Sequence, residues 1–242
     1  MKDFYIIHFD KLDSTNDYLK ENYQKLVNNT VISTSFQEKG KGRLGRIWQN
    51  KPNKDLALSI LIKNNFLDFN EYSLIAGASV YLTLKELGIN SKIKWPNDIL
   101  INDKKVSGIL CEAISYNQNI ECVIVGIGIN INSTGFNISL KNKATSLLLQ
   151  TSNHYNIDSI ENMLLENFKN LYNKALFSDK EYLEICRKNS YLTNKEIDFI
   201  YKNENRTGQV LEILENGDLY VKSNNEYLQL NSGEVTLSKN YK

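Results

Sequence analysis

The sequence is poor in the residues on which several common chemistries depend. Its three cysteines, Cys111, Cys122 and Cys186, include no CxxC pair, which argues against a disulfide framework and a structural zinc site and favours a reducing compartment. The two histidines, His8 and His154, have no partners at the spacing of a metal site or a catalytic triad. There is also no GxSxG-type nucleophile elbow and no Walker A sequence. Zinc, thiol and serine-hydrolase chemistry are therefore poor hypotheses for this chain.

Long hydrophobic runs and excess charge are absent as well. No apolar run approaches the roughly 20 residues that a bilayer-spanning helix needs, and the first residues, MKDFYIIHFDKLD, lack the features of a signal peptide. The formal net charge of +1 provides no general attraction to nucleic acid or to anionic membranes. We expect a cytoplasmic protein with no nucleic-acid or membrane partner, in which any anion is bound locally.

Arginine is scarce too, and half of it lies in one short segment. Four arginines stand against 25 lysines, and Arg43 and Arg46 both fall in QEKGKGRLGRIW at residues 37–48, together with three of the 12 glycines. Arginine offers a planar fork of donors suited to carboxylate and phosphate, and glycine lets the backbone come close to a ligand. This segment is therefore predicted to be an anion-binding loop.

Two other interpretations of the loop are weaker. Its glycines match the dinucleotide-binding GxGxxG spacing, but no helix is expected directly after them to place its dipole on a pyrophosphate. A solvated connecting loop is the simplest alternative. Trp48 argues against it, because a large apolar ring at the end of such a loop normally packs on something.

A second segment, KIKWPNDILINDKKVSGIL at residues 92–110, gathers residues suited to a ligand site. Proline after Trp95 favours extended geometry there and ends the strand, so polar side chains are presented at a strand end. The lysines alone are explained equally well by a hairpin with a solvated turn, but the clustering favours a site. The candidates are Lys94, Asn97, Asp98, Lys105 and Gly108.

Two further features lie in the middle of the chain. VIVGIGINI at residues 123–131 indicates a central strand, which Gly126 and Gly128 weaken unless another group approaches closely. That group is either a ligand, with the Asn130 amide nearby, or a packed helix. Glu112, a carboxylate within an apolar strand, is either an outward-facing residue or a helper at the site, and the sequence does not distinguish the two.

The pattern of apolar residues predicts an α/β main domain at residues 1–190 and a small β domain at residues 191–242. A capping box at residues 14–17 opens a helix that reaches Leu26, and the alternation in LALSILI at residues 56–62 indicates a half-buried strand. The short alternating strands of the second domain are typical of a small barrel. The other strands expected in the main domain cover residues 4–9, 31–36, 93–94, 99–101, 105–113 and 122–129, and the other helices cover residues 70–87, 157–171 and 182–185.

Five motifs together resemble the biotin protein ligases. GKGRLGRIW resembles the family's GRGRxGRxW loop, KWPNDI its KWPND segment and KVSGIL its K-[LV]-[AS]-G-I-L motif, and VGIGININ and ATSL are similar as well. Their order and spacing match across residues 13–147, and the terminal strands match the family's carboxy-terminal domain. The resemblance implies a mixed β-sheet flanked by helices, like the class II aminoacyl-tRNA synthetase catalytic domain, followed by a small SH3-like β-barrel.

The activity that this resemblance implies is an ATP-dependent, AMP-forming biotin ligation. Biotin's carboxylate attacks the α-phosphorus of MgATP to give biotinyl-5′-AMP and pyrophosphate, and a lysine of a biotin carboxyl carrier protein then attacks the adenylate. Mg²⁺ enters with ATP. The sequence does not identify the ligands of this ion or the carrier protein, and it does not decide whether the protein forms a homodimer. A lipoate or octanoate ligase is the alternative, but the RRxSGGG-type loop usual in those enzymes is missing here.

The resemblance also implies roles for individual residues. Lys105 bridges the biotin carboxylate and the α-phosphate, while Arg43 and Arg46 meet phosphate charge, which makes these three the catalytic candidates. The expected biotin contacts are Ser14, Thr15, Asn16, Gln37, Gly40, Lys41, Gly42, Arg43, Trp48, Lys105 and Gly108. The expected ATP contacts are Arg43, Arg46, Lys94, Asn97, Asp98, Asn130 and Ala144.

Two departures from the family pattern bear on function. Lys41 stands where the family loop has its first arginine, which keeps the charge but loses the planar fork. The catalytic pattern begins by residue 5, so we expect neither the DNA-binding domain of the family's repressor members nor operator binding. A nucleic-acid-binding module is disfavoured by the nearly neutral net charge, and a silent biotin binder by the presence of Lys105 and both loop arginines.

Overall fold

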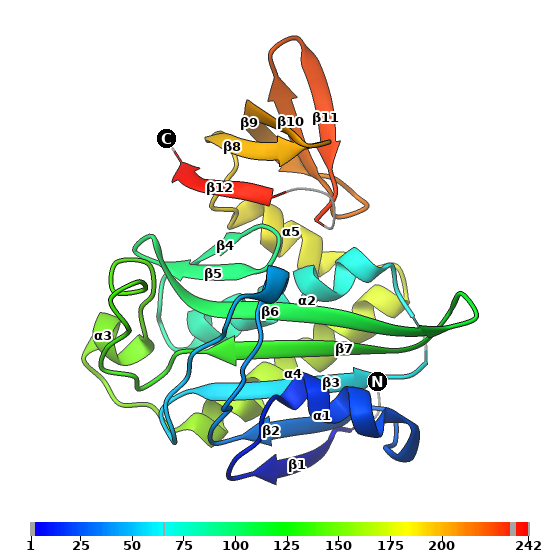
Figure 1. The fold of residues 1–242 in the computed structure, drawn as a ribbon, viewed down its shortest axis with the longest axis vertical. Helices are drawn as coiled ribbons and strands as arrows, with labels where there is room; N and C mark the ends of the chain where they lie inside the picture. The colour runs from blue at the N-terminus through cyan, green and yellow to red at the C-terminus, as the bar shows by residue number, and fades with distance from the viewer. Residues whose placement is uncertain (1–2, 65, 233–235, 242) are drawn as a thin grey trace.

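A seven-stranded mixed sheet forms the centre of the molecule. The computed structural model describes residues 3–64, 66–232 and 236–241. The strands of this sheet span Tyr5–Phe9 (β1), Thr30–Thr34 (β2), Leu56–Ile62 (β3), Lys92–Lys94 (β4), Asp98–Ile101 (β5), Lys104–Tyr116 (β6) and Asn119–Ile129 (β7). Their spatial order is β1-β2-β3-β7-β6-β5-β4 (Figure 1). β1 is parallel to β2, and the other neighbouring pairs are antiparallel.

Helices cover both faces of this sheet. They span Thr15–Asn22 (α1), Phe69–Glu86 (α2), Leu147–Thr151 (α3), Ile157–Leu176 (α4) and Glu181–Lys188 (α5). α1 packs on β2, β3 and β7, whereas α2 lies behind the sheet and packs on α4 and α5 (Figure 1). The predicted mixed sheet flanked by helices is therefore confirmed. Among the described residues, no helix is both long and apolar enough to cross a membrane.

Strand β3 is more deeply buried than its sequence indicates. All seven of its residues are buried, whereas the alternation in LALSILI predicts a strand with one solvated face. Leu56, Leu58 and Ile60 belong to the large core that includes α2 and α4, while Leu61 packs with Leu19 in a second cluster beneath α1. The prediction is wrong because helices on both faces of the sheet exclude water from both sides.

The helix that Ser14 opens is shorter than predicted. The Ser14 side chain accepts a hydrogen bond from the backbone N–H of Asp17 at 3.3 Å, but α1 ends at Asn22 and a single 3-10 turn, Tyr23–Lys25, follows. Leu26 has an extended backbone and still packs on the cluster beneath α1. Its helical spacing therefore reflects burial and not helical structure.

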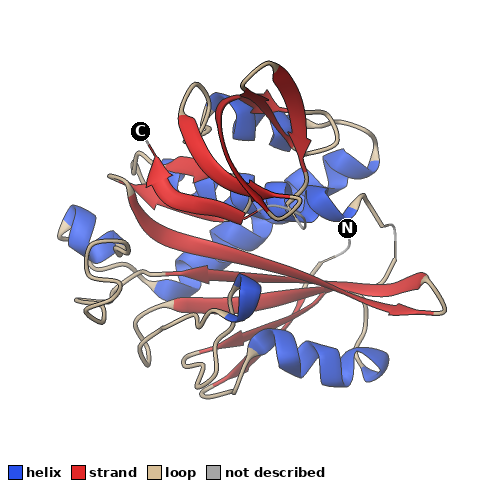
Figure 2. Cartoon of the chain, turned by 45° about the horizontal axis from the view of Figure 1, so that its top comes forward, coloured by secondary structure: helices blue, strands red, loops and turns tan. Residues whose placement is uncertain are grey.

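The last strands form a second, antiparallel sheet (Figure 2). They span Glu196–Tyr201 (β8), Glu204–Ile213 (β9), Leu219–Ser223 (β10), Glu226–Leu230 (β11) and Thr236–Tyr241 (β12), in the order β11-β10-β9-β8-β12. The predicted small β domain is present, although residues 234 and 235 of the expected strand EVTLS lie outside the described residues. The indole N–H of Trp95 donates to the carbonyl of Gly217 at 2.9 Å and joins the two sheets. The division at residue 190 stays a prediction.

Candidate active site

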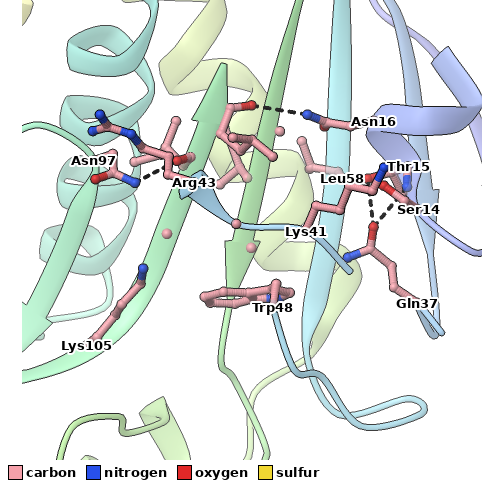
Figure 3. A pocket seen from close by; sticks show the side chains of 17 residues that line it. Ser14, Thr15, Asn16, Gln37, Lys41, Arg43, Trp48, Leu58, Asn97 and Lys105 are labelled. Atoms are coloured by element: carbon pink, nitrogen blue, oxygen red, sulfur yellow. Dashed lines mark hydrogen bonds between the residues drawn. The ribbon is translucent and has the colours of Figure 1, made fainter. Parts of the chain in front are cut away.

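The buried end of the candidate site is a set of neutral polar side chains at the start of α1. Ser14, Thr15 and Asn16 are almost fully buried, and Gln37 faces them. The backbone N–H and the hydroxyl oxygen of Thr15 lie 2.9 and 3.1 Å from the amide oxygen of Gln37. The amide nitrogen of Gln37 is thereby left on the pocket side (Figure 3). A neutral ligand that carries both donors and acceptors suits this end of the site.

The glycine-rich loop folds back on itself as a narrow hairpin. The N–H of Gly42 donates to the carbonyl of Arg46 at 2.8 Å, and the N–H of Trp48 donates to the carbonyl of Gly40 at 2.9 Å. One 3-10 turn, Arg43–Gly45, forms its tip. Glycine is required at the base of the loop, because a Cβ at Gly40 would lie 2.5 Å from the carbonyl oxygen of Trp48.

Lys41, the lysine that replaces the family's first loop arginine, connects the loop to α1. Its Nζ lies 2.6 Å from a carboxylate oxygen of Asp17, which also has Lys20 at 3.6 Å. The hydrogen bond to Asp17 raises the pKa of Lys41, so this side chain stays charged. An ion pair as exposed as this one contributes about 0.2–1 kcal/mol. This weak contact ties the loop to α1, while Arg43 ties it to the second sheet by donating to the carbonyl of Ser232.

Two glycines in β7 make room for side chains from distant parts of the chain. A Cβ at Gly128 would lie 2.4 Å from a ring carbon of Trp48, and a Cβ at Gly126 would lie 2.3 Å from the amide oxygen of Asn16. The prediction that another group approaches this strand closely is confirmed. The approaching groups are the loop tryptophan, which lies at the bottom of the pocket in Figure 3, and the first turn of α1.

Lys105 stands where the pocket meets a larger cleft. Its Nζ lies 2.5 Å from Oδ1 of Asp98 and 5.6 Å from the centre of the Trp48 ring. Gly108 leaves the space for it, since a Cβ there would lie 2.7 Å from the same Nζ. The backbone of Lys105 also bridges to Ala144, which brings the segment after β7 to this point. Lys105 thus presents its charge to both cavities.

The larger cleft has a volume of about 650 Å³ and carries several basic side chains. Burial lowers the pKa of Lys94; the charge of Asp98 opposes this shift and Arg46 adds to it. Burial also lowers the pKa of Arg43, again opposed by Asp98. Crowded and partly desolvated cations of this kind are stabilised by an incoming anion. The cleft is therefore suited to a polyphosphate.

The two asparagines predicted to contact ATP also have structural roles. Nδ2 of Asn97 donates to the carbonyl of Ile109 at 2.9 Å and ties the turn after β4 to β6. Nδ2 of Asn130 donates to the carbonyl of Thr145 at 3.0 Å. The Oδ1 atom of Asn130 is buried and, among the described residues, has no hydrogen-bond partner. A buried acceptor of this kind is suited to a bond with a ligand donor.

The structure brings almost all of the predicted site residues together. The predicted biotin contacts other than Gly40 line the pocket, and the predicted ATP contacts all line the cleft. Gly40 instead lies at the base of the loop. The two cavities form one continuous site, because they share the lining residues Gly42, Arg43, Trp48, Asn97 and Lys105.

Sequence reasoning missed residues at both ends of this site. Phe136 and Leu140 line the cleft, and the only signal for them was that they are large apolar residues in a polar stretch after β7. Ser59 in β3 lies 2.7 Å from the hydroxyl of Thr15 and 2.5 Å from the amide oxygen of Asn16. Its polar character within the apolar strand LALSILI was the available signal.

Known proteins resemble between half and three fifths of this chain in sequence. The model of the biotin/lipoate A/B protein ligase family matches residues 8–130. The bifunctional ligase/repressor BirA of Bacillus subtilis (strain 168) is 35% identical over 153 residues, which cover 59% of this chain and 46% of that protein. The biotin–[acetyl-CoA-carboxylase] ligase of Paracoccus denitrificans is 31% identical over 129 residues, which cover 50% of this chain and 52% of that protein. The chain thus spans about half the length of these curated relatives.

The likeness in three dimensions extends over nearly the whole chain. The structure of a biotin protein ligase from Aquifex aeolicus in complex with biotin and ATP matches with a TM-score of 0.86 and 28% sequence identity, covering 98% of this chain and 99% of that one. The match includes the second sheet as well as the first. Because the family model also covers just over half of the 242 residues, the chain belongs to the biotin/lipoate A/B protein ligase family.

Proposed function

We propose that this protein is a biotin protein ligase, which converts biotin and MgATP to biotinyl-5′-AMP and transfers the biotinyl group to a lysine of a biotin carboxyl carrier protein. The observation that carries the proposal is the position of Lys105 at the junction of a neutral polar pocket and a basic cleft. The similar A. aeolicus protein was solved with biotin and ATP, and the similar P. denitrificans protein is a biotin–[acetyl-CoA-carboxylase] ligase. These relatives support the choice of substrates and of acceptor.

In this proposal biotin lies along the pocket with its ureido ring at the buried polar end. The amide nitrogen of Gln37 donates to the ureido oxygen, and the side chains of Ser14 and Thr15 accept from the ring N–H groups. The apolar part of the ligand passes over the ring of Trp48, which is held against β7. This orientation directs the carboxylate toward Lys105.

Two anions have to meet in the first step, and their repulsion raises its barrier. Lys105 exchanges its partner Asp98 for the biotin carboxylate and the α-phosphate, and so stabilises the charge where the new bond forms. Arg43 and Arg46 add positive charge from the loop. The carboxylate oxygen forms a bond to the α-phosphorus while the bond from that phosphorus to the departing pyrophosphate breaks, which leaves a mixed anhydride.

In the second step the neutral amine of the carrier lysine attacks the acyl carbon and AMP leaves. Closure of the loop over the pocket keeps water from the anhydride until the carrier arrives. The magnesium ion enters with ATP and reduces the charge of the phosphates. Within the described residues no three His, Cys, Asp or Glu side chains form a group that could hold a metal ion. Mg²⁺ needs only one or two carboxylates beside phosphate oxygens and water, and Asp98 and Asp103, which line the cleft, would be the side chains available to it.

ATP–pyrophosphate exchange tests this function with four samples: biotin, lipoate, octanoate and no acid. We expect exchange with biotin only, followed by labelling of a carrier domain when one is added. Exchange with lipoate or octanoate instead would move the protein to the other branch of its family. The absence of exchange with every acid, in a sample shown to be folded, would refute the adenylation step.

A further inference from the structure

A row of hydrogen-bonding groups runs from the pocket to a carboxylate beyond it. Nδ2 of Asn16 donates to Glu112 at 2.8 Å, and Oδ1 of Asn16 lies 2.5 Å from the hydroxyl of Ser59. That hydroxyl lies 2.7 Å from the hydroxyl of Thr15, which in turn lies 3.1 Å from the amide oxygen of Gln37. We call these five residues the polar row. It connects the ligand-facing side chains to β6 through groups that the mechanism above does not use.

Glu112 sets the orientation of one end of the polar row. A carboxylate only accepts hydrogen bonds, so Asn16 turns its amide nitrogen toward Glu112 and its oxygen toward Ser59. The carbonyl of Leu110 accepts a second, longer bond of 3.3 Å from the same nitrogen. Lys20 pairs with the other oxygen of Glu112 at 2.5 Å and holds the carboxylate in place. The oxygen of Asn16 is therefore a fixed acceptor.

A count of protons then gives the row its direction. Gln37, Thr15, Ser59 and Asn16 are joined by three O···O contacts, but their two hydroxyls supply only two protons. Because the oxygen of Asn16 cannot donate, Ser59 donates its one proton to Asn16 and has none left for Thr15. The proton of Thr15 then goes to an acceptor inside the protein, either the amide oxygen of Gln37 at 3.1 Å or the hydroxyl oxygen of Ser59 at 2.7 Å.

We propose that Glu112 is a specificity-determining positioning residue: its charge fixes the Asn16 oxygen as the acceptor of the Ser59 proton, so that Ser59 does not donate to Thr15 and the Thr15 oxygen meets the ligand as an acceptor. The amide nitrogen of Gln37 lies beside it as a donor (Figure 3). A donor next to an acceptor complements the C=O and N–H edge of a cyclic urea. A dithiolane or an alkyl chain has no such edge, and a site built for hydrogen bonds rejects a ligand that lacks them. This inference rests on the proposed function.

The test compares wild type with Glu112→Gln, Ser59→Ala and the double variant. Biotin Kd is measured by calorimetry without ATP, and biotin KM and kcat by pyrophosphate exchange. Loss of the Glu112 charge or of the Ser59 hydroxyl is expected to raise Kd and KM for biotin about fivefold, since one hydrogen bond to the ligand is weakened. The value of kcat at saturating biotin should change less than about twofold, because the reacting carboxylate lies at the other end of the ligand. The double variant is expected to be no worse than Ser59→Ala alone, because the row is already broken.

A matched control removes a neighbouring carboxylate that lies outside the row. Glu121 is on the same β6–β7 hairpin and accepts a hydrogen bond from the hydroxyl of Tyr23, so Glu121→Gln is expected to leave biotin KM unchanged. The proposal is overturned by an unchanged KM in Glu112→Gln, by a loss confined to kcat, or by additive effects in the double variant. If thermal unfolding shows that Ser59→Ala does not fold, the biotin KM and kcat of Glu112→Gln alone test the proposal. If wild type neither binds biotin nor supports exchange, the proposed function is itself wrong and this assignment falls with it.

Discussion

The two ends of the site are built in opposite ways. At the end that we propose for the biotin ring (the ring end), Thr15, Asn16 and Ser59 are 4% exposed or less, and their side chains are already hydrogen-bonded to one another. At the end that we propose for the ATP phosphates (the phosphate end), burial lowers the pKa of Lys94 and of Arg43, because desolvation disfavours their charged forms. The ring end is preorganised for recognition. An incoming anion would offset that desolvation, so the phosphate end is suited to the proposed reaction more than to the resting protein.

Removal of the cation between the two ends should have the largest effect. Lys105→Ala is expected to lower kcat for pyrophosphate exchange by about 100- to 1,000-fold, because the two substrate anions then meet without the ammonium that stabilises their developing contact. Biotin Kd, measured by calorimetry, should change far less, since the ring end is intact. Lys104→Ala is the matched control, because this neighbouring side chain lies outside the residues that line the two cavities. An exchange rate of Lys105→Ala within tenfold of wild type would contradict the assigned role.

A Cβ beneath the tryptophan should disturb both ends at once. Gly128→Ala places a carbon 2.4 Å from the Trp48 ring, so the ring and the loop that carries it must shift. A displacement of that size is expected to lower kcat/KM for biotin about 10- to 100-fold in steady-state exchange.

Gly77→Ala is the control for the Trp48 clash, because a Cβ in the middle of α2 meets its nearest neighbour at 3.8 Å. It should leave activity unchanged and raise the free energy of unfolding by about 0.5–1 kcal/mol, as measured by denaturant titration. Equal activity in the Gly77 and Gly128 variants would show that the ring position does not matter.

The phosphate end should also show a pH dependence that the ring end lacks. Because burial lowers the pKa of Lys94 from the ordinary 10.5, its charge is lost at a lower pH than that of a solvated lysine, and KM for ATP should begin to rise there. In Lys94→Arg the charge persists, so the rise should move to higher pH while KM for biotin stays flat. The folded state binds this proton less tightly than the unfolded chain does, so the free energy of unfolding should increase as pH rises through the lowered pKa. Identical KM profiles for ATP in the two proteins would refute this account.

The ion pair between the loop and α1 should have the smallest effect. Asp17→Asn removes the partner of Lys41 and is expected to release biotinyl-5′-AMP about two- to fivefold faster, because an exposed ion pair contributes no more than about 1 kcal/mol. The difference should shrink in high salt. Glu181→Gln removes another exposed ion pair, with Lys174, and should not alter release. The measurement is the dissociation of labelled adenylate, and a salt-independent change would point to a different cause.

Much of the phosphate end could be predicted because its residues are informative one at a time. Arg43 and Arg46 stand out in a chain with four arginines, and Lys94, Asp98 and Lys105 lie close together in the sequence. Local patterns also predicted most helices and strands, since periodicity depends on nearby residues. Such patterns failed for the burial of β3, which was predicted to have one solvated face, and for the length of α1. In both cases the reason was a helix or cluster contributed by another part of the chain.

The sequence by itself determined most of the helices and strands, and it identified the glycine-rich loop and the basic residues that the structure brings together in the cleft. Only the tertiary structure decided the role of Glu112, which lies 96 positions from its partner Asn16, and the reason for the glycines of β7, which accommodate Asn16 and Trp48. The physical reason is that a hydrogen bond or a close packing contact depends on a distance of a few ångströms. Such a distance between remote residues is set by the packing of the whole fold, and no local pattern of residues records it.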